Sequence, residues 1–497
     1  MKRADAIARL GEEKIWEVVI IGGGATGIYA ALDAASRGYR TLLLERGDFA
    51  GGTSSRSTKL IHGGVRYLRQ AQLGLVRSSL HERTLLLRNA PSLVHSRNFV
   101  VPVYSLWEKI YYGAGLKGYD LLARGHQPES SRVLSREETL AALPTLQSDR
   151  LTGGVRYSDG QFDDTALILA LAVAATGHGA TVLNYAPVTA LRKTNHRVTG
   201  VIVRDVETGT MHELRARVVI NATGVFGDAV RRLDDAHVPS LLAPSQGAHI
   251  VLPRDFLPGD TALMIPKTSD GRLLFVIPWQ GRVLLGTTDT AVSEISPEPV
   301  PFADEIDFLL EHAALYLQRA PTRADVLSVF AGLRPLVKTG TGPTSALSRD
   351  HVITVSPSGL VTIAGGKWTT ARKMAEAVVT QAATAGDLLK LPCRTSGLAI
   401  AHPLPAAGDP VDDAFVTTVA KTTMARTVED VLSRRSRLLY LDARAALAAA
   451  PLVAASLARV LGRDAAWQAA QLDTFRALVR QHLPAPSAPA ETARGSS

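Results

Sequence analysis

The sequence contains a single cysteine, Cys393, among 497 residues. One cysteine cannot form an intrachain disulfide, and it cannot supply the several thiolates of a cysteine-ligated zinc site or an iron–sulfur cluster. Any redox chemistry therefore needs an organic cofactor, and we predict no metal centre. Charged residues make up only 20% of the chain and hydrophobic residues 46%, which excludes a largely disordered protein.

Long hydrophobic runs are also scarce. Charged residues such as Asp5 and Arg9 interrupt the N-terminal segment, so it lacks the pattern of a signal peptide. No run reaches about 18 apolar residues, because the nearest candidates, 166–175 and 445–458, are short or contain Pro451. We therefore expect a cytoplasmic protein that associates only peripherally with the inner face of the cytoplasmic membrane.

The net charge of the chain excludes fewer classes of function than the lack of cysteine and of long hydrophobic runs does. Lys and Arg number 55 against 46 Asp and Glu, which gives a formal charge of +9. A basic balance accompanies nucleic acid, anionic lipid or anionic substrates, and it also occurs on ordinary protein surfaces. The excess is modest, so it selects none of these partners. The length indicates two to three domains.

The most informative pattern lies near the N-terminus. An apolar run at 18–21 ends in Gly22-x-Gly24-x-x-Gly27, and a helix of small residues is predicted at 28–37. The first glycine permits a tight turn, the second lets a pyrophosphate approach the backbone, and the third lets the helix pack on the strand. The start of that helix would offer N–H groups to the phosphates.

An acidic residue follows at the position where a dinucleotide site needs one. A second apolar run, 41–44, ends on Glu45, which lies 18 residues beyond Gly27. A carboxylate there accepts hydrogen bonds from an adenosine ribose and repels a 2′-phosphate. The pattern therefore favours NAD or FAD over NADP.

Strands that end in glycine recur far along the chain, near Gly224 and Gly365. Between them, 246–290 contains short strands separated by turns, and alanine-rich helices dominate after about residue 392. We predict an α/β fold with a Rossmann-like FAD-binding domain, an inserted antiparallel-sheet substrate domain and a C-terminal α-helical domain. The predicted ranges are 14–90, 150–240 and 340–390 for FAD binding, 91–149 and 241–339 for the substrate or cap domain, 393–483 for the helical domain, and 484–497 for a disordered tail.

Seven motifs, spread in order over nearly the whole chain, carry a family resemblance. They are G-G-T-S-S-R-S-T-K-L-I-H-G-G-V-R-Y-L at 51–68, Q-G-A-H-I at 246–250, F-V-I-P-W at 275–279, G-T-T-D at 286–289, G-L-R-P-L at 332–336, G-G-K-W-T-T at 365–370 and E-D-V-L-S-R-R-S-R at 429–437. Together they resemble the motifs of FAD-dependent glycerol-3-phosphate dehydrogenases, quinone-linked enzymes whose C-terminal part is a helical cap.

The resemblance implies FAD as the cofactor and sn-glycerol 3-phosphate as the substrate. Hydroxyls, bare backbone and a histidine ring in these motifs suit a phosphate-rich, flat cofactor. The predicted cofactor-binding residues are Gly22, Gly24, Gly27, Glu45, Thr53, Ser54, Ser55, Lys59, His62, Gly63, Gly64, Thr223, Gly224, Gly365, Gly366 and Thr369.

A dianionic phosphate needs several cations, and the planar fork of arginine binds its oxygens two at a time. The resemblance places Arg66, Arg334, Arg349 and Lys367 at the substrate, and Tyr67 would add a hydroxyl contact. We predict these five as substrate-binding residues.

The implied reaction moves a hydride from C2 of the alcohol to the flavin N5 while the C2 hydroxyl loses its proton. A base with a pKa near neutrality is needed, and His249 fits; the alternative is a histidine that only hydrogen-bonds the substrate. Arg334 or Lys367 would polarise the hydroxyl, and Lys367 could instead stabilise the reduced flavin. The sequence leaves these roles open.

The electron acceptor is the second open question, because relatives in this family use membrane quinone or molecular oxygen. Segment 100–125 mixes aromatic residues such as Trp107 and Tyr111 with Lys109 and Lys117, which is typical of an interfacial helix but also of an amphipathic helix packed on a core. No long polar insertion is present, which favours a dehydrogenase using ubiquinone or menaquinone over an oxidase that makes hydrogen peroxide.

Two further interpretations concern partners. A non-catalytic FAD-binding module that docks on nucleic acid would explain the charge, but it leaves the arginine and lysine set without a use, so we predict no nucleic-acid partner. A homodimer is possible on this sequence, which gives no signal for or against it.

Overall fold

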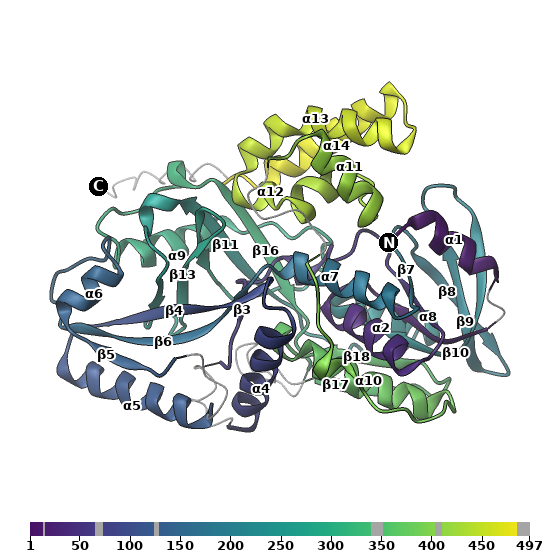
Figure 1. The fold of residues 1–497 in the computed structure, drawn as a ribbon, viewed down its shortest axis with the longest axis horizontal. Helices are drawn as coiled ribbons and strands as arrows, with labels where there is room; N and C mark the ends of the chain where they lie inside the picture. Colours follow the sequence, from purple (N-terminus) through teal and green to yellow (C-terminus); the bar gives the residue numbers. More distant parts are fainter. Residues whose placement is uncertain (13–14, 65–72, 124–128, 339–350, 403–409, 485–497) are drawn as a thin grey trace, which may run out of the picture.

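The computed structural model describes residues 1–12, 15–64, 73–123, 129–338, 351–402 and 410–484. Within these residues the chain forms two β-sheets with covering helices, and a group of helices from the C-terminal part sits above the junction of the two sheets (Figure 1). This arrangement confirms the predicted fold class. Of the predicted tail, only Pro484 falls within the described residues.

The first sheet is mostly parallel, with strand order β17-β18-β10-β1-β2-β7. β1 pairs in parallel with β10 and β2, and antiparallel β8 and β9 extend β10 as a ribbon. The apolar run at 18–21 in β1 suits a strand covered on both faces. The strands are β1 (Trp16–Ile21), β2 (Thr41–Leu44), β7 (Thr181–Leu183), β8 (Val188–Thr194), β9 (Arg197–Arg204), β10 (Met211–Asn221), β17 (His351–Val355) and β18 (Val361–Gly365).

Helices cover this sheet and close its core. α2 packs against both α7 and α10, and all three contribute to one large apolar cluster with β1 and β2. α7 is apolar on every side, as a helix enclosed by protein must be. The helices of this part are α1 (Arg3–Glu12), α2 (Ala25–Arg37), α7 (Asp164–Gly177), α8 (Gly227–Asp234) and α10 (Ala371–Ala385).

The turn between β1 and α2 depends on glycine in the way the sequence predicts. Gly22 has φ of 113°, a conformation that other residues rarely adopt. A Cβ added at Gly27 would overlap the carbonyl oxygen of Gly22, so α2 can lie against the end of β1 only without a side chain there. The third glycine of the motif therefore has a packing role.

The second sheet has the order β15-β11-β14-β13-β12-β4-β6-β3, with β16 beside β11 and β5 beside β6. α9 (Ala303–Ala314) packs against β11, and α4 (Leu73–Asn89), α5 (Leu106–Leu122) and α6 (Arg136–Ala142) lie against β4 and β6. The strands are β3 (Leu60–Ile61), β4 (Val94–Val103), β5 (Arg132–Leu134), β6 (Gly153–Phe162), β11 (Ser245–Pro253), β12 (Ala262–Ile265), β13 (Leu274–Trp279), β14 (Arg282–Gly286), β15 (Thr290–Ala291) and β16 (Ser328–Arg334).

The structure differs from the sequence prediction in this region. β3 and β6 lie in ranges assigned to the FAD-binding domain, yet both pair in the second sheet. β4 and β12 run parallel, so the sheet is not purely antiparallel. Segment 100–125 is not a single helix, because residues up to Val103 complete β4 and Ser105 caps α5. These pairings join segments that are distant in the chain, so the local hydrophobic periodicity of the sequence cannot predict them.

The C-terminal helices form their own apolar core, in agreement with the predicted helical domain. They are α11 (Asp413–Thr422), a π-helical turn (Asp430–Arg435), α12 (Leu438–Leu441), α13 (Ala443–Leu461) and α14 (Ala465–Gln481). Pro451 lies inside α13 without ending it. Among the described helices, α13 alone is long and apolar enough to cross a membrane by length and composition. It supplies buried residues to this core, and packed core helices pass the same test.

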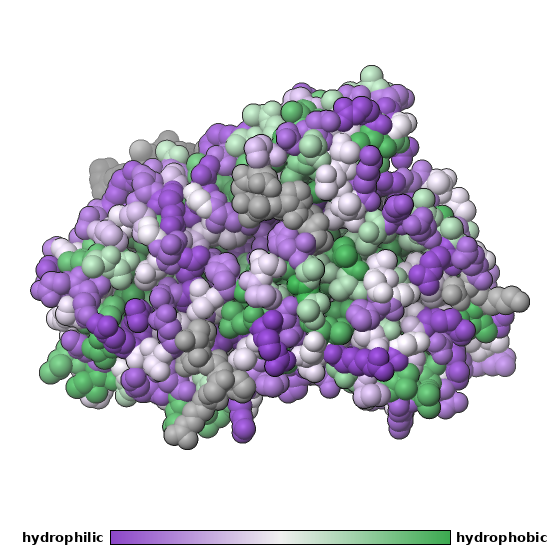
Figure 2. Space-filling view, in the orientation of Figure 1, coloured by the Kyte–Doolittle hydropathy of each residue, from purple (hydrophilic) through white to green (hydrophobic). Residues whose placement is uncertain are grey.

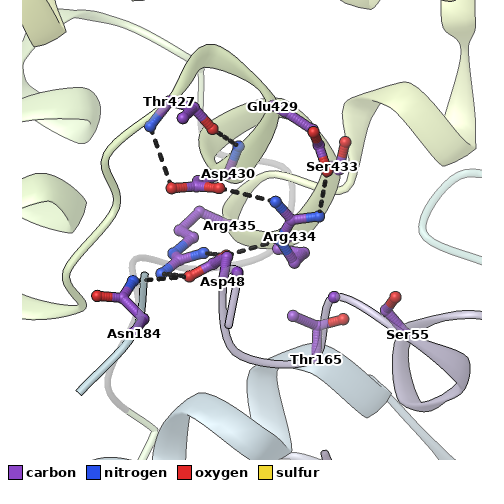
Figure 3. Close-up of polar contacts among 12 residues, drawn as sticks. Asp48, Ser55, Thr165, Asn184, Thr427, Glu429, Asp430, Ser433, Arg434 and Arg435 are labelled. Carbon is purple, nitrogen blue, oxygen red and sulfur yellow. Dashed lines mark hydrogen bonds and ion pairs between the residues drawn. The ribbon is translucent and has the colours of Figure 1, made fainter. Parts of the chain in front are cut away.

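Buried ion pairs fasten the helical domain to the first sheet (Figure 3). Asp48, which follows β2, accepts a hydrogen bond from Arg434 Nε at 2.6 Å and pairs with Arg435. Arg434 also binds Asp430 Oδ1 at 2.7 Å. Since these side chains are almost fully buried, each charge depends on its partner, and the domain is held in one position.

Candidate active site

A cavity of about 830 Å³ opens at the carboxyl ends of β1, β2, β10 and β18. Ligands of open α/β sheets bind at this edge. The C-terminal domain closes one side of the cavity through the π-helical turn and α14. Nine of the predicted cofactor residues line it: Gly22, Gly24, Glu45, Thr53, Ser54, Thr223, Gly224, Gly365 and Gly366.

At the glycine turn that lines this cavity, neighbouring atoms lie so close to the backbone that no side chain fits. A Cβ added at Gly22 would lie 2.6 Å from the Ala222 carbonyl oxygen, and one at Gly23 would lie 2.9 Å from Glu45 Cβ. The start of α2 lines the cavity through Gly24, Ala25 and Thr26, and the Ala25 N–H donates to Ser54 Oγ at 3.0 Å. These features fit the pyrophosphate of a dinucleotide such as FAD.

Glu45 holds the far end of the turn. Its carboxylate accepts hydrogen bonds from the backbone N–H of Gly23 at 2.6 Å and of Gly47 at 2.9 Å. Burial raises the pKa of Glu45, and the two backbone donors act in the opposite direction. The carboxylate thus fixes the glycine turn and lines the cavity at the position predicted for a ribose contact.

Five predicted cofactor residues do not line either cavity that we describe: Gly27, Ser55, Lys59, Gly63 and Gly64. Lys59 is the clearest difference from prediction. Its ammonium is fully buried, 2.6 Å from both Asp164 Oδ2 and the Ser55 carbonyl oxygen. Burial lowers the pKa of Lys59 to about 7, while Asp164 raises it. A positive charge beside a phosphate-binding motif looked like a cofactor contact in the sequence, but its partner is a carboxylate on α7.

A second cavity of about 270 Å³ adjoins the first. Both are lined by Thr53, Pro335, Gly366, Lys367 and Trp368, so one ligand could reach from the first to the edge of the second. The predicted residues His62 and Thr369 lie here and not in the larger cavity, as do His249 and Arg334. Within the part of the chain that the structure describes, no group of three or more His, Cys, Asp or Glu could hold a metal ion.

His249, on β11, is enclosed at the wall of the smaller cavity. Its Nε2 lies 2.9 Å from Thr58 Oγ1, and its ring stacks on Phe330 with centroids 4.9 Å apart. Its Nδ1 is buried and has no hydrogen-bond partner among the described residues. Burial, with the positive charges of Lys59 and Arg334, lowers the pKa of His249 well below 6.5. The ring is therefore neutral at pH 7, and it is a weaker base than the near-neutral histidine that the sequence predicted.

Two arginines meet at Asp289, which also lines this cavity. Arg334, at the end of β16, lies 3.1 Å from Asp289 Oδ1 and donates to the Thr288 carbonyl oxygen at 2.8 Å. Arg272 donates to the Asp289 carbonyl oxygen at 2.8 Å and pairs with Asp270 at 3.0 Å. Sequence reasoning predicted Arg334 and missed Arg272. The only signal for Arg272 was its place between a Ser-Asp-Gly turn and β13, which is equally typical of a surface arginine.

Three predicted substrate residues, Arg66, Tyr67 and Arg349, lie outside the described residues. The segment before the first two is placed: His62 donates its backbone N–H to Thr369 Oγ1 at 3.3 Å, which joins the motif at 51–68 to the one at 365–370. Two motifs that are 300 residues apart in the chain therefore meet at the junction of the two cavities.

Comparison with known proteins agrees with this architecture. The family model "FAD dependent oxidoreductase" matches residues 17–379, and "C-terminal domain of alpha-glycerophosphate oxidase" matches residues 404–468. A solved structure, the glycerol-3-phosphate dehydrogenase from Bacillus halodurans complexed with FAD, has a TM-score of 0.78 and 26% identity. It covers 98% of this chain and 99% of its own.

Curated relatives are more similar in sequence. Mitochondrial glycerol-3-phosphate dehydrogenase of Macaca fascicularis is 46% identical over 402 residues, covering 77% of this chain and 55% of that protein. The protein of the same name from Saccharomyces cerevisiae is 40% identical over 445 residues, covering 81% of this chain and 68% of that protein. The chain thus spans about half to two thirds of the length of these relatives.

Proposed function

Because the chain belongs to the family of FAD-dependent glycerol-3-phosphate dehydrogenases, we propose that it oxidises sn-glycerol 3-phosphate to dihydroxyacetone phosphate. One observation carries this proposal: a dinucleotide-sized cavity opens beside a small, positively charged one, and Lys367 lines both. The smaller cavity suits a three-carbon phosphate ester in volume and in charge.

FAD, when bound in the larger cavity, supplies an acceptor for two electrons as a hydride. The chain's own residues would hold it through the Gly22-to-Gly24 backbone, the N-terminus of α2 and the carboxylate of Glu45. Trp368 donates its indole N–H to the Ser54 carbonyl oxygen at 3.0 Å, which keeps the wall between the two cavities in place.

The substrate phosphate would bind among the cations of the smaller cavity. Four cationic side chains line it, namely Arg56, Arg272, Arg334 and Lys367, against the two carboxylates of Asp159 and Asp289. Guanidinium groups anchored by their own hydrogen bonds are pre-positioned for a phosphate, so little ordering entropy is lost on binding.

His249 would take the proton from the C2 hydroxyl. A neutral ring with one nitrogen held by Thr58 and the other without a partner among the described residues is suited to that role. An anionic substrate nearby would raise the pKa of the ring, which favours proton transfer once the substrate is bound. Lys367 would stabilise negative charge at the junction of the cavities.

The electron acceptor that we propose is a membrane quinone, with the protein held peripherally at the cytoplasmic face. Support comes from α5, whose surface carries exposed Leu106, Trp107, Ile110 and Tyr111. Hydrophobic residues gather over this helix at the lower left of Figure 2. An apolar helix face flanked by lysines, such as Lys117, is the composition that binds an anionic lipid surface.

The first test is the anaerobic absorbance of the purified protein before and after addition of sn-glycerol 3-phosphate. Bleaching of the oxidised flavin band supports both cofactor and substrate, and an unchanged band with flavin present contradicts the substrate. Reoxidation by air that is as fast as reoxidation by a soluble quinone would favour the oxidase alternative.

The acceptor proposal has a separate test. Leu106→Ser with Ile110→Ser should reduce binding to vesicles of anionic phospholipid and leave flavin reduction by substrate unchanged. Leu315→Ser is the matched control, because Leu315 is 68% exposed and Leu106 72%, but Leu315 lies outside α5. Equal vesicle binding by both variants contradicts the assignment of α5.

A further inference from the structure

One carboxylate in the smaller cavity works against the substrate that we propose. Asp159, on β6, lines this cavity together with Arg272 and Arg334. A carboxylate that faces such a cavity repels a phosphate, because repulsion between like charges is strong where water is excluded. The cavity therefore needs some means of containing the charge of Asp159.

Both oxygens of Asp159 are bound by side chains that line neither cavity. Arg83, on α4, binds Oδ1 at 2.6 Å, and Tyr119, on α5, donates its hydroxyl to Oδ2 at 2.9 Å. Both side chains are fully buried. The Tyr119 oxygen in turn accepts the backbone N–H of Gly63 at 2.9 Å. Arg83 and Tyr119 thus bind one carboxylate from two helices, and Gly63 of the 51–68 motif supports it through Tyr119.

We propose that Tyr119 is a positioning residue that, with Arg83, holds the Asp159 carboxylate away from the smaller cavity and so allows an anionic substrate to bind there. This inference rests on the proposed function. It assigns a role to a residue of α5 that points inward, opposite to the exposed apolar side of that helix.

Two further features support the assignment. Burial and the nearby Asp159 raise the pKa of Tyr119 well above 10, so the phenol remains a hydrogen-bond donor throughout the working pH range. Gly63 has no room for a Cβ, which would overlap the Tyr119 hydroxyl and Leu80. The tyrosine oxygen is therefore confined between a backbone N–H and a carboxylate, and both contacts are lost together if the hydroxyl is removed.

The test is Tyr119→Phe in the FAD-loaded full chain. Inorganic phosphate is the probe, and its dissociation constant is followed by the shift that it causes in the flavin absorbance. We expect phosphate to bind about tenfold more weakly, because a charge-assisted bond of this kind is lost. The KM for sn-glycerol 3-phosphate should rise by a similar factor with kcat within about twofold, and oxidation of uncharged glycerol at high concentration should change little.

Tyr39→Phe is the matched control. Tyr39 is also buried and donates its hydroxyl to a backbone oxygen, that of Leu389, at 2.6 Å. Leu389 lines neither cavity, whereas Asp159, the partner of Tyr119, lines the smaller one. Equal effects of the two variants, or equal losses for phosphate and glycerol, overturn the proposal. Arg83→Lys, which keeps the charge, should have a smaller effect on phosphate than Arg83→Gln. If sn-glycerol 3-phosphate fails to reduce the wild-type flavin, the proposed function fails, while the phosphate comparison still decides the role of Tyr119.

Discussion

The two adjoining cavities recognise their ligands by different means. The larger is built on glycine turns and backbone N–H groups at the end of a parallel sheet, and Glu45 serves it by bonding that backbone. The smaller is built from charged side chains that come from the second sheet, such as Asp159 on β6 and Arg334 on β16, and from segments outside the strands, such as Arg272 and Lys367. A backbone cradle depends on spacing within a few residues, whereas a side-chain site depends on distant elements meeting correctly.

This contrast says where each cavity is vulnerable. The larger should fail when a side chain intrudes on its backbone and should tolerate the loss of a single charge. The smaller should keep its shape but lose affinity or rate when one side chain changes. Four of the predictions that follow, on Gly27, His249, Arg272 and Glu45, test that division, beginning with the largest effect.

Gly27→Val should abolish FAD binding. Any Cβ at this position would overlap the Gly22 carbonyl oxygen, so α2 would have to move off β1 and the phosphate cradle would be lost. The ratio of flavin to protein absorbance after purification measures the effect. Gly11→Ala is the control, because nothing lies within 4 Å of an added Cβ at Gly11. Stoichiometric FAD in Gly27→Val would contradict the proposal that the glycine turn and the start of α2 bind the phosphates of FAD.

Asp164→Asn should destabilise the protein far more than Lys59→Met, although the two side chains form one pair. Asp164 faces both Lys59 at 2.6 Å and Arg437 at 3.1 Å, so its loss leaves two buried cations without their carboxylate. We expect a cost on the order of 3–5 kcal/mol for Asp164→Asn. Lys59→Met keeps the Arg437–Asp164 pair and should cost less. Urea unfolding of both variants gives the comparison, and equal losses contradict this account.

Nine of the sixteen predicted cofactor residues line the larger cavity, while His249, Arg334 and Lys367 are the predicted catalytic and substrate residues that line the smaller. Gly22, Gly24 and Glu45 form a pattern within 24 positions, and short-range spacing is what a sequence records directly. Asp159 reaches the smaller cavity on β6, which pairs with β4, and Thr58 and Arg272 reach it from the segments just before β3 and β13. Such pairing depends on packing over the whole sheet, so a single sequence does not reveal it.

The same reason explains two differences between prediction and structure, the burial of Lys59 and the place of β3 and β6 in the second sheet. Lys59 sits in a motif that suggested a cofactor contact, but its burial depends on α7 and the C-terminal domain, which supply Asp164 and Arg437. β3 and β6 follow or precede segments of the FAD-binding domain in the chain, and only their hydrogen bonding places them in the second sheet. Neither the burial of Lys59 nor the pairing of β3 and β6 can be predicted from the neighbouring residues in the sequence.

His249→Asn should lower kcat by about 100-fold or more, equivalent to about 3 kcal/mol, with FAD retained and substrate affinity only slightly changed. Burial lowers the pKa of His249 well below 6.5, so the free enzyme holds the ring neutral above that range. The acid limb of kcat/KM should therefore lie below pH 6.5 in the wild type and disappear in the variant. Thr58→Val, which removes only the bond to Nε2, should have a smaller effect. Near-normal flavin reduction by His249→Asn would remove His249 from the chemistry.

His249 also makes folding stability depend on pH. The folded pKa is below the unfolded value of about 6.5, so the unfolded state binds more protons as the pH falls through that value. The contribution of the neutral ring is complete above pH 6.5 and is lost progressively below it. Denaturation at pH 5.5 and 7.5 should show this loss in the wild type and less of it in His249→Asn.

Arg272→Ala should raise the KM for sn-glycerol 3-phosphate by about tenfold, or about 1.4 kcal/mol, with kcat nearly unchanged. Arg272 lines the smaller cavity and holds the Asp289 backbone, and Arg334 keeps its own bond to Asp289 after the change. Steady-state kinetics with a soluble quinone measures the effect. Arg319→Ala is a suitable control, because Arg319 is an exposed arginine whose side chain lies outside both cavities. A fall in kcat without a change in KM would place Arg272 in the chemical step instead of the phosphate site.

Glu45→Gln should have the smallest effect, a loss of FAD affinity of a few-fold, or about 1 kcal/mol. The amide oxygen of glutamine can still accept a hydrogen bond from Gly23 or Gly47, so the turn keeps part of its support, and burial already disfavours the charge of Glu45. Titration of FAD into the apoprotein, followed by flavin fluorescence, measures the loss. A loss of FAD affinity of 100-fold or more would mean that a single charge, and not the backbone, holds the cofactor. The larger cavity would then depend on a charged side chain, as the smaller one does, and the contrast between the two would be wrong.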